Sequence, residues 1–305
     1  MSERVVTEGN RSVRLSSADR ELWPGEGITK GDLLDYYQAV APALLPHLRD
    51  RPFTMKRFRE GAAKPFFFQK DAPKGMPDWI PTRTFRTHPR EGGSRLVRFP
   101  LVQDELALAW MVQMHCIDLN VWYSRVDKPQ RPDFVLFDLD PPDDGFRDAV
   151  RVAHLIRGLM DDVGLESHVK TSGADGIHVV VPIARRATFE QTYAFAEEAS
   201  RLLEGRHPGL VTTEWLIRKR RGVLVDHRQN GAGKTIASVY SVRPKPGAPV
   251  STPLRWEELT EDLRPTDFTM ARALERIAQH GDLFEGVLSG GQPLATARRA
   301  LAKLD

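Results

Sequence analysis

The stretch FVLFDLDPP, from Phe134 to Pro142, decides how the rest of the sequence is interpreted. Its apolar run is typical of a buried β-strand, and the two prolines that follow end the strand. Side chains alternate between the two faces of a strand, so Asp138 and Asp140 share one face. Two carboxylates at this spacing repel each other unless a divalent cation lies between them. The stretch therefore predicts a strand that ends in a metal site, although a lone DxD motif also occurs in ordinary turns and on surfaces.

The composition is that of a globular protein. The chain has 305 residues, of which 41% are hydrophobic and 28% are charged. No apolar run reaches the roughly 20 residues that span a bilayer, and the N-terminus has no stretch like a signal peptide. We therefore expect a cytoplasmic protein with no membrane contact. The single cysteine, Cys116, excludes a cysteine-based zinc site in this sequence, which leaves carboxylates and imidazoles and favours magnesium or manganese.

Positive charge is concentrated in two stretches, although the formal net charge is only +3. From Thr213 to Lys245 there are eight Lys or Arg residues and two acids. From Arg83 to Arg98, five arginines, Arg90 among them, accompany one acid, Glu91. Such stretches suggest a polyanionic ligand held on one side of the protein, and a solvated surface is the alternative.

The order of the expected elements predicts an α/β or α+β fold with mixed sheets flanked by helices. Helical spacing of apolar residues predicts a helix from about Lys30 to Leu48, opened by a capping box of Thr29 and Asp32. Further helices are expected from about Gly145 to Val163 and after Thr188. The tail 290–305 is Gly-rich and then helical, and we expect it to be loosely attached. The expected strands are Arg51–Phe58, Phe134–Asp140, Val169–Ser172, Ile177–Ile183, Gly222–Arg228 and Ile236–Val242.

A second motif is KTSGADGIHVVVPI, from Lys170 to Ile183. Its glycines allow a tight turn with exposed amides, Ser172 offers a hydroxyl, and the imidazole of His178 can face the turn. These groups suit a triphosphate, and an ordinary hairpin with a core histidine is the alternative.

A third motif is VLVDHRQN, from Val223 to Asn230, where Asp226 interrupts a strand. A carboxylate in mid-strand is either a salt-bridged structural residue or the third ligand of a two-metal site with the aspartate pair. The following segment 231–235 resembles the end of a phosphate-binding loop but has Arg228 where the first glycine is needed. We interpret this segment as a hairpin turn.

In the order and chemistry of these three motifs, with a further basic residue at Arg243, the sequence resembles the archaeo-eukaryotic primase superfamily. Within this superfamily it resembles specifically the polymerase domain of bacterial DNA ligase D, which acts in non-homologous end joining. The resemblance runs through nearly the whole chain. It includes LSSADRELWP (15–24), TKGDLLDYYQAVAP (29–42), RPFTMKRF (51–58), FFFQK (66–70), VSTPLRWEEL (250–259) and DFTMARALERIAQHGDLF (267–284).

The resemblance implies a primase-like catalytic domain at 1–289, with DNA-contacting elements in about 1–130, a catalytic core in about 131–289 and a tail at 290–305. It implies template-directed addition of nucleotides, preferably ribonucleotides, by two divalent metal ions, with Mn²⁺ preferred over Mg²⁺. The metal ligands and catalytic residues implied are Asp138, Asp140 and Asp226. The nucleotide contacts implied are Lys56, Ser172, His178, Arg218, Arg220, Gln229 and Arg243.

The resemblance also implies contacts to DNA with gaps or broken ends. Phe66 and Phe67 match an aromatic pair that stacks on template bases, and Phe68 is expected to be the buried one of the three. His115 matches a residue near the primer terminus, and Arg20 and Lys30 match a pocket for a 5'-phosphate. Two departures from the family bear on end recognition. This sequence has Ser17 and Arg20 where relatives tend to have Asn and Lys, and it has Asp175 where relatives often have a basic residue.

The partners implied are nucleoside triphosphates, gapped or broken DNA, and Ku with a DNA ligase, for a protein expected to be monomeric. The sequence contains no KxDG ligase motif, so we expect either a stand-alone primase-polymerase or a domain of a longer ligase D. Two other classes stay open from the residues alone. They are a metal-dependent phosphoesterase that acts on nucleic acid ends and a non-catalytic nucleic-acid-binding module.

Overall fold

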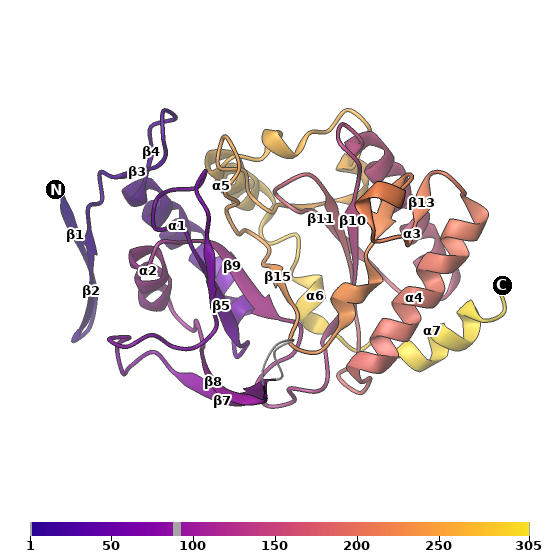
Figure 1. The fold of residues 1–305 in the computed structure, drawn as a ribbon, viewed down its shortest axis with the longest axis horizontal. Helices are drawn as coiled ribbons and strands as arrows, with labels where there is room; N and C mark the ends of the chain where they lie inside the picture. The colour runs from indigo at the N-terminus through magenta and orange to yellow at the C-terminus, as the bar shows by residue number, and fades with distance from the viewer. Residues whose placement is uncertain (1, 88–92, 305) are drawn as a thin grey trace. The chain divides into compact units, whose positions relative to one another are not determined.

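The structure is a computed structural model that describes residues 2–87 and 93–304, so Arg90 and Glu91 lie outside the described residues. The chain forms two compact units, and it passes from one to the other several times (Figure 1). Unit 1 consists of Met1–Asp127, Thr235–Ser251 and Phe268–Gly281. Unit 2 consists of Lys128–Lys234, Thr252–Asp267 and Asp282–Asp305.

Unit 2 is built on a six-stranded mixed sheet, in the order β13-β14-β10-β12-β11-β16. The predicted strand Phe134–Asp140 is β10, and it pairs antiparallel with β12 on one side and β14 on the other. The pairing of β13 with β14 is parallel, which confirms the expectation of a mixed sheet. The other strands are β11 (His168–Thr171), β12 (Ile177–Pro182), β13 (Val211–Thr212), β14 (Val223–Val225) and β16 (Pro253–Leu254).

Helices α3 and α4 both contact β10, so the central strand of unit 2 is packed by helices as well as by strands. Buried apolar residues of α3, such as Val150, Ala153 and Ile156, recur at helical spacing, as the sequence predicted. The helices of unit 2 are α3 (Phe146–Asp162), α4 (Phe189–Arg206), α6 (Gly286–Ser289) and α7 (Leu294–Leu301). Four 3-10 helices lie at Ile217–Lys219, His227–Asn230, Trp256–Glu258 and Pro265–Asp267.

The expectation that the tail is loosely attached is wrong. Leu294, Ala297 and Leu301 of α7 are buried, and α7 packs beside α4 (Figure 1). Arg298 Nε donates to a carboxylate oxygen of Glu198 on α4 at 2.9 Å. The apolar spacing of the tail is therefore that of a helix with a packed face.

Unit 1 contains a four-stranded sheet in the order β15-β9-β5-β6. Helix α1 begins at Lys30 with the predicted capping box of Thr29 and Asp32 and ends at Leu48. The buried hydroxyl of Tyr37 in α1 donates to the carbonyl oxygen of Ile117 in β9 at 2.6 Å, which ties the helix to the sheet. The helices of unit 1 are α1 (Lys30–Leu48), α2 (Glu105–Gln113) and α5 (Met270–His280). Its strands are β1 (Glu3–Glu8), β2 (Arg11–Ser16), β3 (Glu21–Trp23), β4 (Ile28–Thr29), β5 (Phe53–Arg57), β6 (Phe67–Gln69), β7 (Thr82–Thr87), β8 (Arg95–Pro100), β9 (Cys116–Trp122) and β15 (Thr235–Ala237).

Two predictions about the segment after β14 are wrong. The strand ends at Val225, and Asp226 is the N-cap of the 3-10 helix His227–Asn230 instead of a mid-strand residue. The segment 231–235 is not a hairpin turn, because β14 and β15 belong to different sheets. The physical reason for both differences is Asn230. Its side-chain amide bonds the backbone of Leu136 in the place where a neighbouring strand would otherwise pair. Its Oδ1 accepts from the Leu136 amide at 2.9 Å, and its Nδ2 donates to the Leu136 carbonyl at 2.7 Å.

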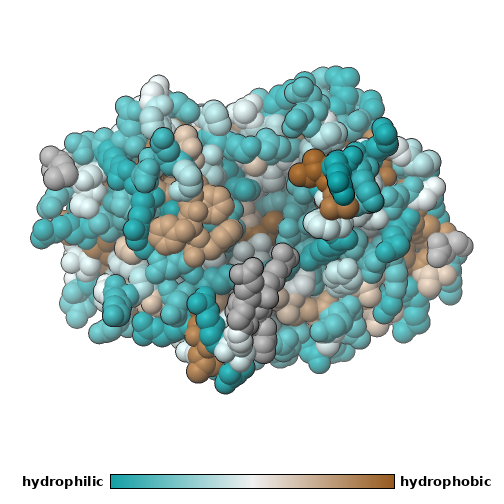
Figure 2. Space-filling view, viewed as in Figure 1, coloured by the Kyte–Doolittle hydropathy of each residue, from teal (hydrophilic) through white to brown (hydrophobic). Residues whose placement is uncertain are grey.

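The surface that Figure 2 shows is hydrophilic over most of its area and carries a few separate hydrophobic patches. None of the helices in the described part of the chain has both the length and the hydropathy of a membrane span. The large apolar side chains that are exposed among the described residues are Val5, Phe66, Phe67, Phe68, Leu96, Trp215 and Ile217.

Gly176, in the turn between β11 and β12, approaches β10 more closely than any larger residue could. A Cβ atom at this position would lie 2.2 Å from the carbonyl oxygen of Leu139. We therefore expect Gly176→Ala to lower the free energy of unfolding by about 1–3 kcal/mol, the usual cost of overpacking. Chemical denaturation followed by circular dichroism measures this change.

Gly158→Ala is the matched control, because Gly158 lies in α3 and a Cβ atom there would meet open space. Alanine at this helical position should raise the free energy of unfolding by up to about 1 kcal/mol. Equal stability of the two variants would show that the turn does not press on Leu139.

Candidate active site

The three predicted catalytic carboxylates of unit 2 come together where β10 and β14 end. Asp138 and Asp140 lie in the last three residues of β10, and Leu224 of β14 lies opposite Asp140 in the register. The chain leaves β14 after Val225, and the amide of Asp226 donates to the carbonyl oxygen of Asp138 at 2.8 Å. The end of the sheet thus carries two carboxyl side chains from β10 and a third, Asp226, from the residue that follows β14.

These carboxylates interact electrostatically. Burial raises the pKa of Asp140 to about 7, with the negative charges of Asp138 and Asp226 as the next causes, while Arg220 acts in the opposite direction. Burial and the two neighbouring carboxylates thus both favour the protonated form of Asp140, and Arg220 offsets them only in part.

The donor set fits a hard divalent cation in chemistry, since all three side chains offer carboxylate oxygens. The side chains do not form a finished cage: within residues 2–87 and 93–304, no group of three or more metal-ligating side chains is clustered closely enough to hold an ion. Asp138 Oδ1 lies 3.2 Å from His178 Nε2. Asp226 accepts hydrogen bonds from the Arg228 amide at 3.0 Å and from Gln229 Nε2 at 3.4 Å. A bound cation would compete with these contacts, and it would relieve the repulsion around Asp140.

His178 is held between a lysine and an aspartate in the interior of unit 2. It lies opposite both Asp138 and Lys170 in the register of neighbouring strands. Lys170 Nζ is 2.7 Å from His178 Nδ1, and His178 Nε2 faces Asp138. When Lys170 is charged it has only donors, so Nδ1 accepts, and a neutral imidazole then carries its proton on Nε2. Lys170 therefore sets the tautomer with which His178 faces Asp138.

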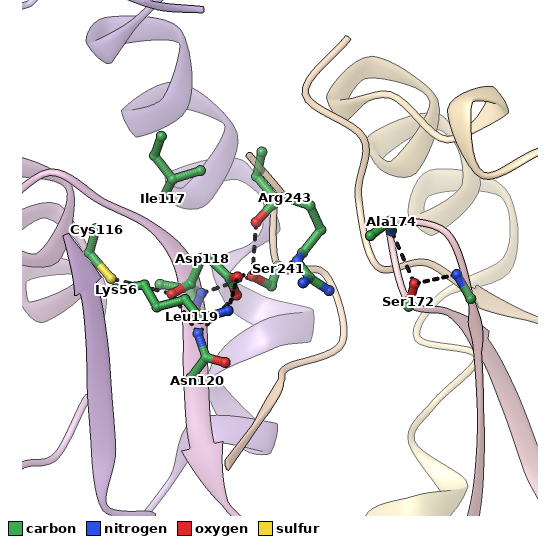
Figure 3. Close-up of polar contacts among 12 residues, drawn as sticks. Lys56, Cys116, Ile117, Asp118, Leu119, Asn120, Ser172, Ala174, Ser241 and Arg243 are labelled. Atoms are coloured by element: carbon green, nitrogen blue, oxygen red, sulfur yellow. Dashed lines mark hydrogen bonds and ion pairs between the residues drawn. The ribbon is translucent and has the colours of Figure 1, made fainter. Parts of the chain in front are cut away.

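Ser172 organises the turn that follows β11. Its Oγ accepts hydrogen bonds from the amides of Ala174 at 3.1 Å and of Gly176 at 3.0 Å, as Figure 3 shows for this loop. Gly173 has a φ of 72°, a conformation that glycine adopts without strain. The expectation that the amides of this turn are exposed is therefore wrong for Ala174 and Gly176, because the Ser172 hydroxyl uses both.

The other predicted nucleotide contacts of unit 2 lie in the segment 215–230. Arg220 donates to the carbonyl oxygen of Trp215 at 3.2 Å, and its charge acts on Asp140. Arg218 lies in the exposed 3-10 helix Ile217–Lys219. Gln229 donates to Asp226. The structure therefore places Arg220 and Gln229 beside the carboxylates, and it places Arg218 on the adjoining surface segment.

Lys56 and Arg243, the predicted nucleotide contacts of unit 1, meet at a buried aspartate. Figure 3 shows both side chains pointing toward Asp118 of β9. Lys56 Nζ lies 2.9 Å and Arg243 Nε lies 3.3 Å from the same oxygen, Asp118 Oδ2. Asn120 Nδ2 donates to the other oxygen, Oδ1, at 2.9 Å. The positive charge of Arg243, followed by that of Lys56, opposes the effect of burial and lowers the pKa of Asp118.

All three phenylalanines at 66–68 are exposed, so the expectation that Phe68 is buried is wrong. Phe68 is 55% exposed, compared with 43% for Phe66 and 39% for Phe67. Phe66 and Phe68 lie edge to face with centroids 5.2 Å apart, and Lys56 lies over both rings. Phe67 faces the guanidinium groups of Arg57 and Arg59 instead. The structure thus pairs Phe66 with Phe68, whereas the resemblance paired Phe66 with Phe67.

Arg20, Lys30 and His115 form a basic cluster in unit 1. Lys30 is 1% exposed, and its Nζ donates to Gln113 Oε1 at 2.7 Å and to the Ser16 carbonyl at 3.1 Å. Burial, followed by the charge of Arg20, lowers the pKa of Lys30 to about 8. Burial and then the charges of Lys30 and Arg20 lower the pKa of His115 to about 4. The cluster concentrates positive charge around Lys30 and keeps His115 neutral at pH 7.

Comparison with known proteins assigns the chain to a family. A family described as "LigD, primase-polymerase domain" matches residues 29–284. The chain belongs to the LigD primase-polymerase family. Members of this family are DNA-directed nucleotidyltransferases, and the primase-like fold predicted from the sequence is confirmed by the structural comparison below.

Relatives and a solved structure agree with the family. The chain is 33% identical over 288 residues to the multifunctional non-homologous end joining protein LigD of Mycolicibacterium smegmatis, covering 93% of this chain and 37% of that protein. It is 31% identical over 272 residues to the bifunctional LigD of Bacillus subtilis, covering 88% and 43%. The chain thus spans less than half the length of these relatives. The solved polymerase domain of Mycobacterium tuberculosis ligase D in complex with DNA matches with a TM-score of 0.83 and 31% identity, over 91% of this chain and 98% of that one.

Two residues of this family member were missed by sequence reasoning, although each left a signal. Asp118 is a charged residue in the apolar strand CIDLNVW, the same kind of interruption that identified Asp226. Lys170 lies in a strand next to His178, and the spacing of the turn places the two residues opposite each other. The Lys170 signal indicates His178 through the hairpin register, whereas the Asp118 signal does not indicate Arg243, which lies 125 positions along the chain.

The tautomer of His178 can be tested in the protein without any substrate. Long-range proton–nitrogen NMR correlations should show Nδ1 as an unprotonated nitrogen and Nε2 as a protonated one, because Lys170 donates to Nδ1. In Lys170→Met the preference for this tautomer should weaken. A spectrum of the unsubstituted protein with the proton on Nδ1 would contradict the arrangement.

Proposed function

We propose that this protein is a template-directed primase-polymerase that adds nucleotides, preferably ribonucleotides, to DNA 3' ends at gaps and double-strand breaks during non-homologous end joining. The observation that carries the proposal is the grouping of Asp138, Asp140 and Asp226 at the end of the central strand, in a chain of the LigD primase-polymerase family. Residues 1–289 are proposed to act as one catalytic domain.

The carboxylates of Asp138, Asp140 and Asp226 would hold two divalent ions, with Mn²⁺ preferred over Mg²⁺. When bound, such ions increase the acidity of a primer 3'-hydroxyl and stabilise the leaving oxygens of a triphosphate. Ser172 and His178 are proposed to contact the nucleotide phosphates, and His178 would do so with its tautomer fixed by Lys170. Further nucleotide contacts are assigned to Lys56, Arg218, Arg220, Gln229 and Arg243. Catalysis by these residues is positioning and charge neutralisation.

Contacts to DNA are proposed for unit 1. The exposed rings of Phe66 and Phe67 suit stacking on template bases, which tolerates any sequence. Phe68, which is more exposed still, is added to this surface. His115 is proposed to approach the primer terminus. Arg20 and Lys30 are proposed to bind the 5'-phosphate of a downstream strand, and their concentrated positive charge supports this role.

The partners proposed are nucleoside triphosphates, gapped or broken DNA, Ku and a DNA ligase, for a protein that acts as a monomer. The names of the relatives refer to non-homologous end joining, and the solved relative is in complex with DNA. These names support the assignment of the partners.

Loss of a single carboxylate tests the reaction. Asp138→Asn or Asp226→Asn should reduce manganese-dependent primer extension on a 5'-phosphorylated gap by at least about a hundredfold, because each removes a proposed metal ligand. Asp162→Asn, at an exposed carboxylate near the end of α3, is the control and should retain activity. Gel analysis with ribonucleotides and deoxynucleotides measures the products.

Unchanged extension by both site variants would refute the proposed function. Shortening of the strand without nucleotide addition would instead support a phosphoesterase. DNA binding without any extension by the unsubstituted protein in manganese would support a non-catalytic module.

The lowered pKa of Lys30 makes recognition of a 5'-phosphate sensitive to pH. The Lys30 side chain carries a positive charge below its pKa of about 8, and it loses this charge as the pH rises through that value. A terminal phosphate is already ionised above its second pKa of about 6. The affinity ratio between gaps with and without a 5'-phosphate should therefore fall by about tenfold between pH 7 and pH 9. Fluorescence anisotropy measures both affinities.

Lys30→Arg is the matched control, because arginine stays charged over this range and should make the ratio independent of pH. Lys30→Ala should give a low ratio at every pH. A ratio that is the same for Lys30→Ala and the unsubstituted protein would show that Lys30 does not bind the phosphate.

A further inference from the structure

We propose that Asp118 is a positioning residue that fixes Lys56 and Arg243 in the arrangement with which they bind the triphosphate of the incoming nucleotide. The proposal rests on the proposed function, because it takes the role of these two cations from it. Asp118 itself does not touch the nucleotide and acts only through the two side chains.

The burial of Asp118 is the first step toward this inference. The residue is 0% exposed, and an ionised carboxylate in such a position is costly unless charges and hydrogen bonds compensate it. Its pKa is nevertheless lowered, because Arg243 and Lys56 outweigh the effect of burial. The carboxylate is therefore ionised at neutral pH and serves as a fixed negative charge.

The geometry of the carboxylate shows what this charge does. Lys56 Nζ and Arg243 Nε both contact Oδ2, at 2.9 Å and 3.3 Å, and Figure 3 shows the two side chains converging on it. Two cations this close to each other repel, so their proximity depends on the carboxylate between them. One negative charge against two positive charges leaves a net charge of +1, and the group as a whole still attracts an anion.

The surroundings hold Asp118 in a single orientation. Asn120 Nδ2 donates to Asp118 Oδ1 at 2.9 Å and to the Asp118 backbone carbonyl at 3.0 Å. The amide of Leu119 donates to Ser241 Oγ at 2.9 Å, which anchors β9 to the segment that carries Arg243. Lys56 lies opposite Asp118 in the register of β5 and β9. The carboxylate thus has little freedom to turn away from either cation.

Lys56 also connects this group to the exposed aromatic surface. Its Nζ lies 5.2 Å from the ring centroid of Phe66 and 5.5 Å from that of Phe68. A lysine that is free to leave Asp118 would lose its place over both rings. Asp118 therefore positions one cation with respect to both the nucleotide and the surface proposed to stack on the template.

Steady-state extension with manganese tests the proposal in Asp118→Asn. Without the negative charge, the two cations should separate, and the apparent KM for the nucleotide should rise by about tenfold while kcat changes by less than about threefold. Asn120→Ala, which keeps the charge but loosens its orientation, should raise KM by a smaller factor. Thr54→Val removes a buried hydroxyl from β5, two residues from Lys56, and should leave KM unchanged.

A double substitution separates positioning from general damage. If Asp118 acts through Lys56, then Lys56→Met should raise KM much less in the Asp118→Asn protein than in the unsubstituted protein. Additive effects of the two substitutions would overturn the proposal. If Asp118→Asn does not fold, as judged by its thermal transition, the same cycle is run with Asn120→Ala.

The outcomes distinguish this proposal from the function on which it rests. Loss of extension in Asp138→Asn, together with an unchanged nucleotide KM in Asp118→Asn and Asn120→Ala, would overturn only the positioning role. Full extension in Asp138→Asn would overturn the proposed function itself.

Discussion

A carboxylate that leaves water must find positive charge or hydrogen-bond donors, and this requirement accounts for the polar interior of both units. In unit 1 the protein meets it with its own side chains, since two cations and an amide surround Asp118. In unit 2 it is met only in part. Asp138 faces His178 and Asp226 accepts from a backbone amide, whereas Asp140 lies exposed at the end of β10 and has a raised pKa. A bound cation would favour the ionised form of Asp140 and relieve the repulsion among the three carboxylates.

The place of these carboxylates in the sheet also bears on how the site is held. β10 is bonded to strands on both sides and contacts α3 and α4, so its backbone is held both by the sheet and by helices. Two of the three carboxylates lie on this strand, so the positions of their backbone atoms are fixed. The register of β10 with β12 places His178 opposite Asp138. The close approach of Gly176 to Leu139 holds the Ser172 turn against the same strand. A rigid backbone here reduces the reorganisation that substrate binding would require.

Features of the fold that depend on residues close together in the sequence could be predicted. The bounds of β10 and of α1 follow from alternation, prolines and a capping box, and the structure has them where the sequence placed them. The end of β14 could not be predicted, because Asn230 contacts Leu136 across 94 residues and draws the chain out of the sheet. Phe68 was expected to be the buried one because the resemblance assigned only Phe66 and Phe67 to stacking, yet it is exposed on β6, the edge strand of its sheet. The partners of Asp118 were missed for the same reason as Asn230, since Lys56 and Arg243 are distant in the chain. Lys170 differs, because it faces His178 across a local hairpin.

The side chain of Asn230 has one further consequence for the sheet of unit 2. By bonding both backbone groups of Leu136, it caps the flank of β10 beyond the point where β14 stops. Backbone groups left unpaired on a strand can recruit a strand from another chain, and here a single amide occupies that place. Although β14 has already ended at this level, Leu136 therefore offers no unpaired backbone groups to a strand of another chain.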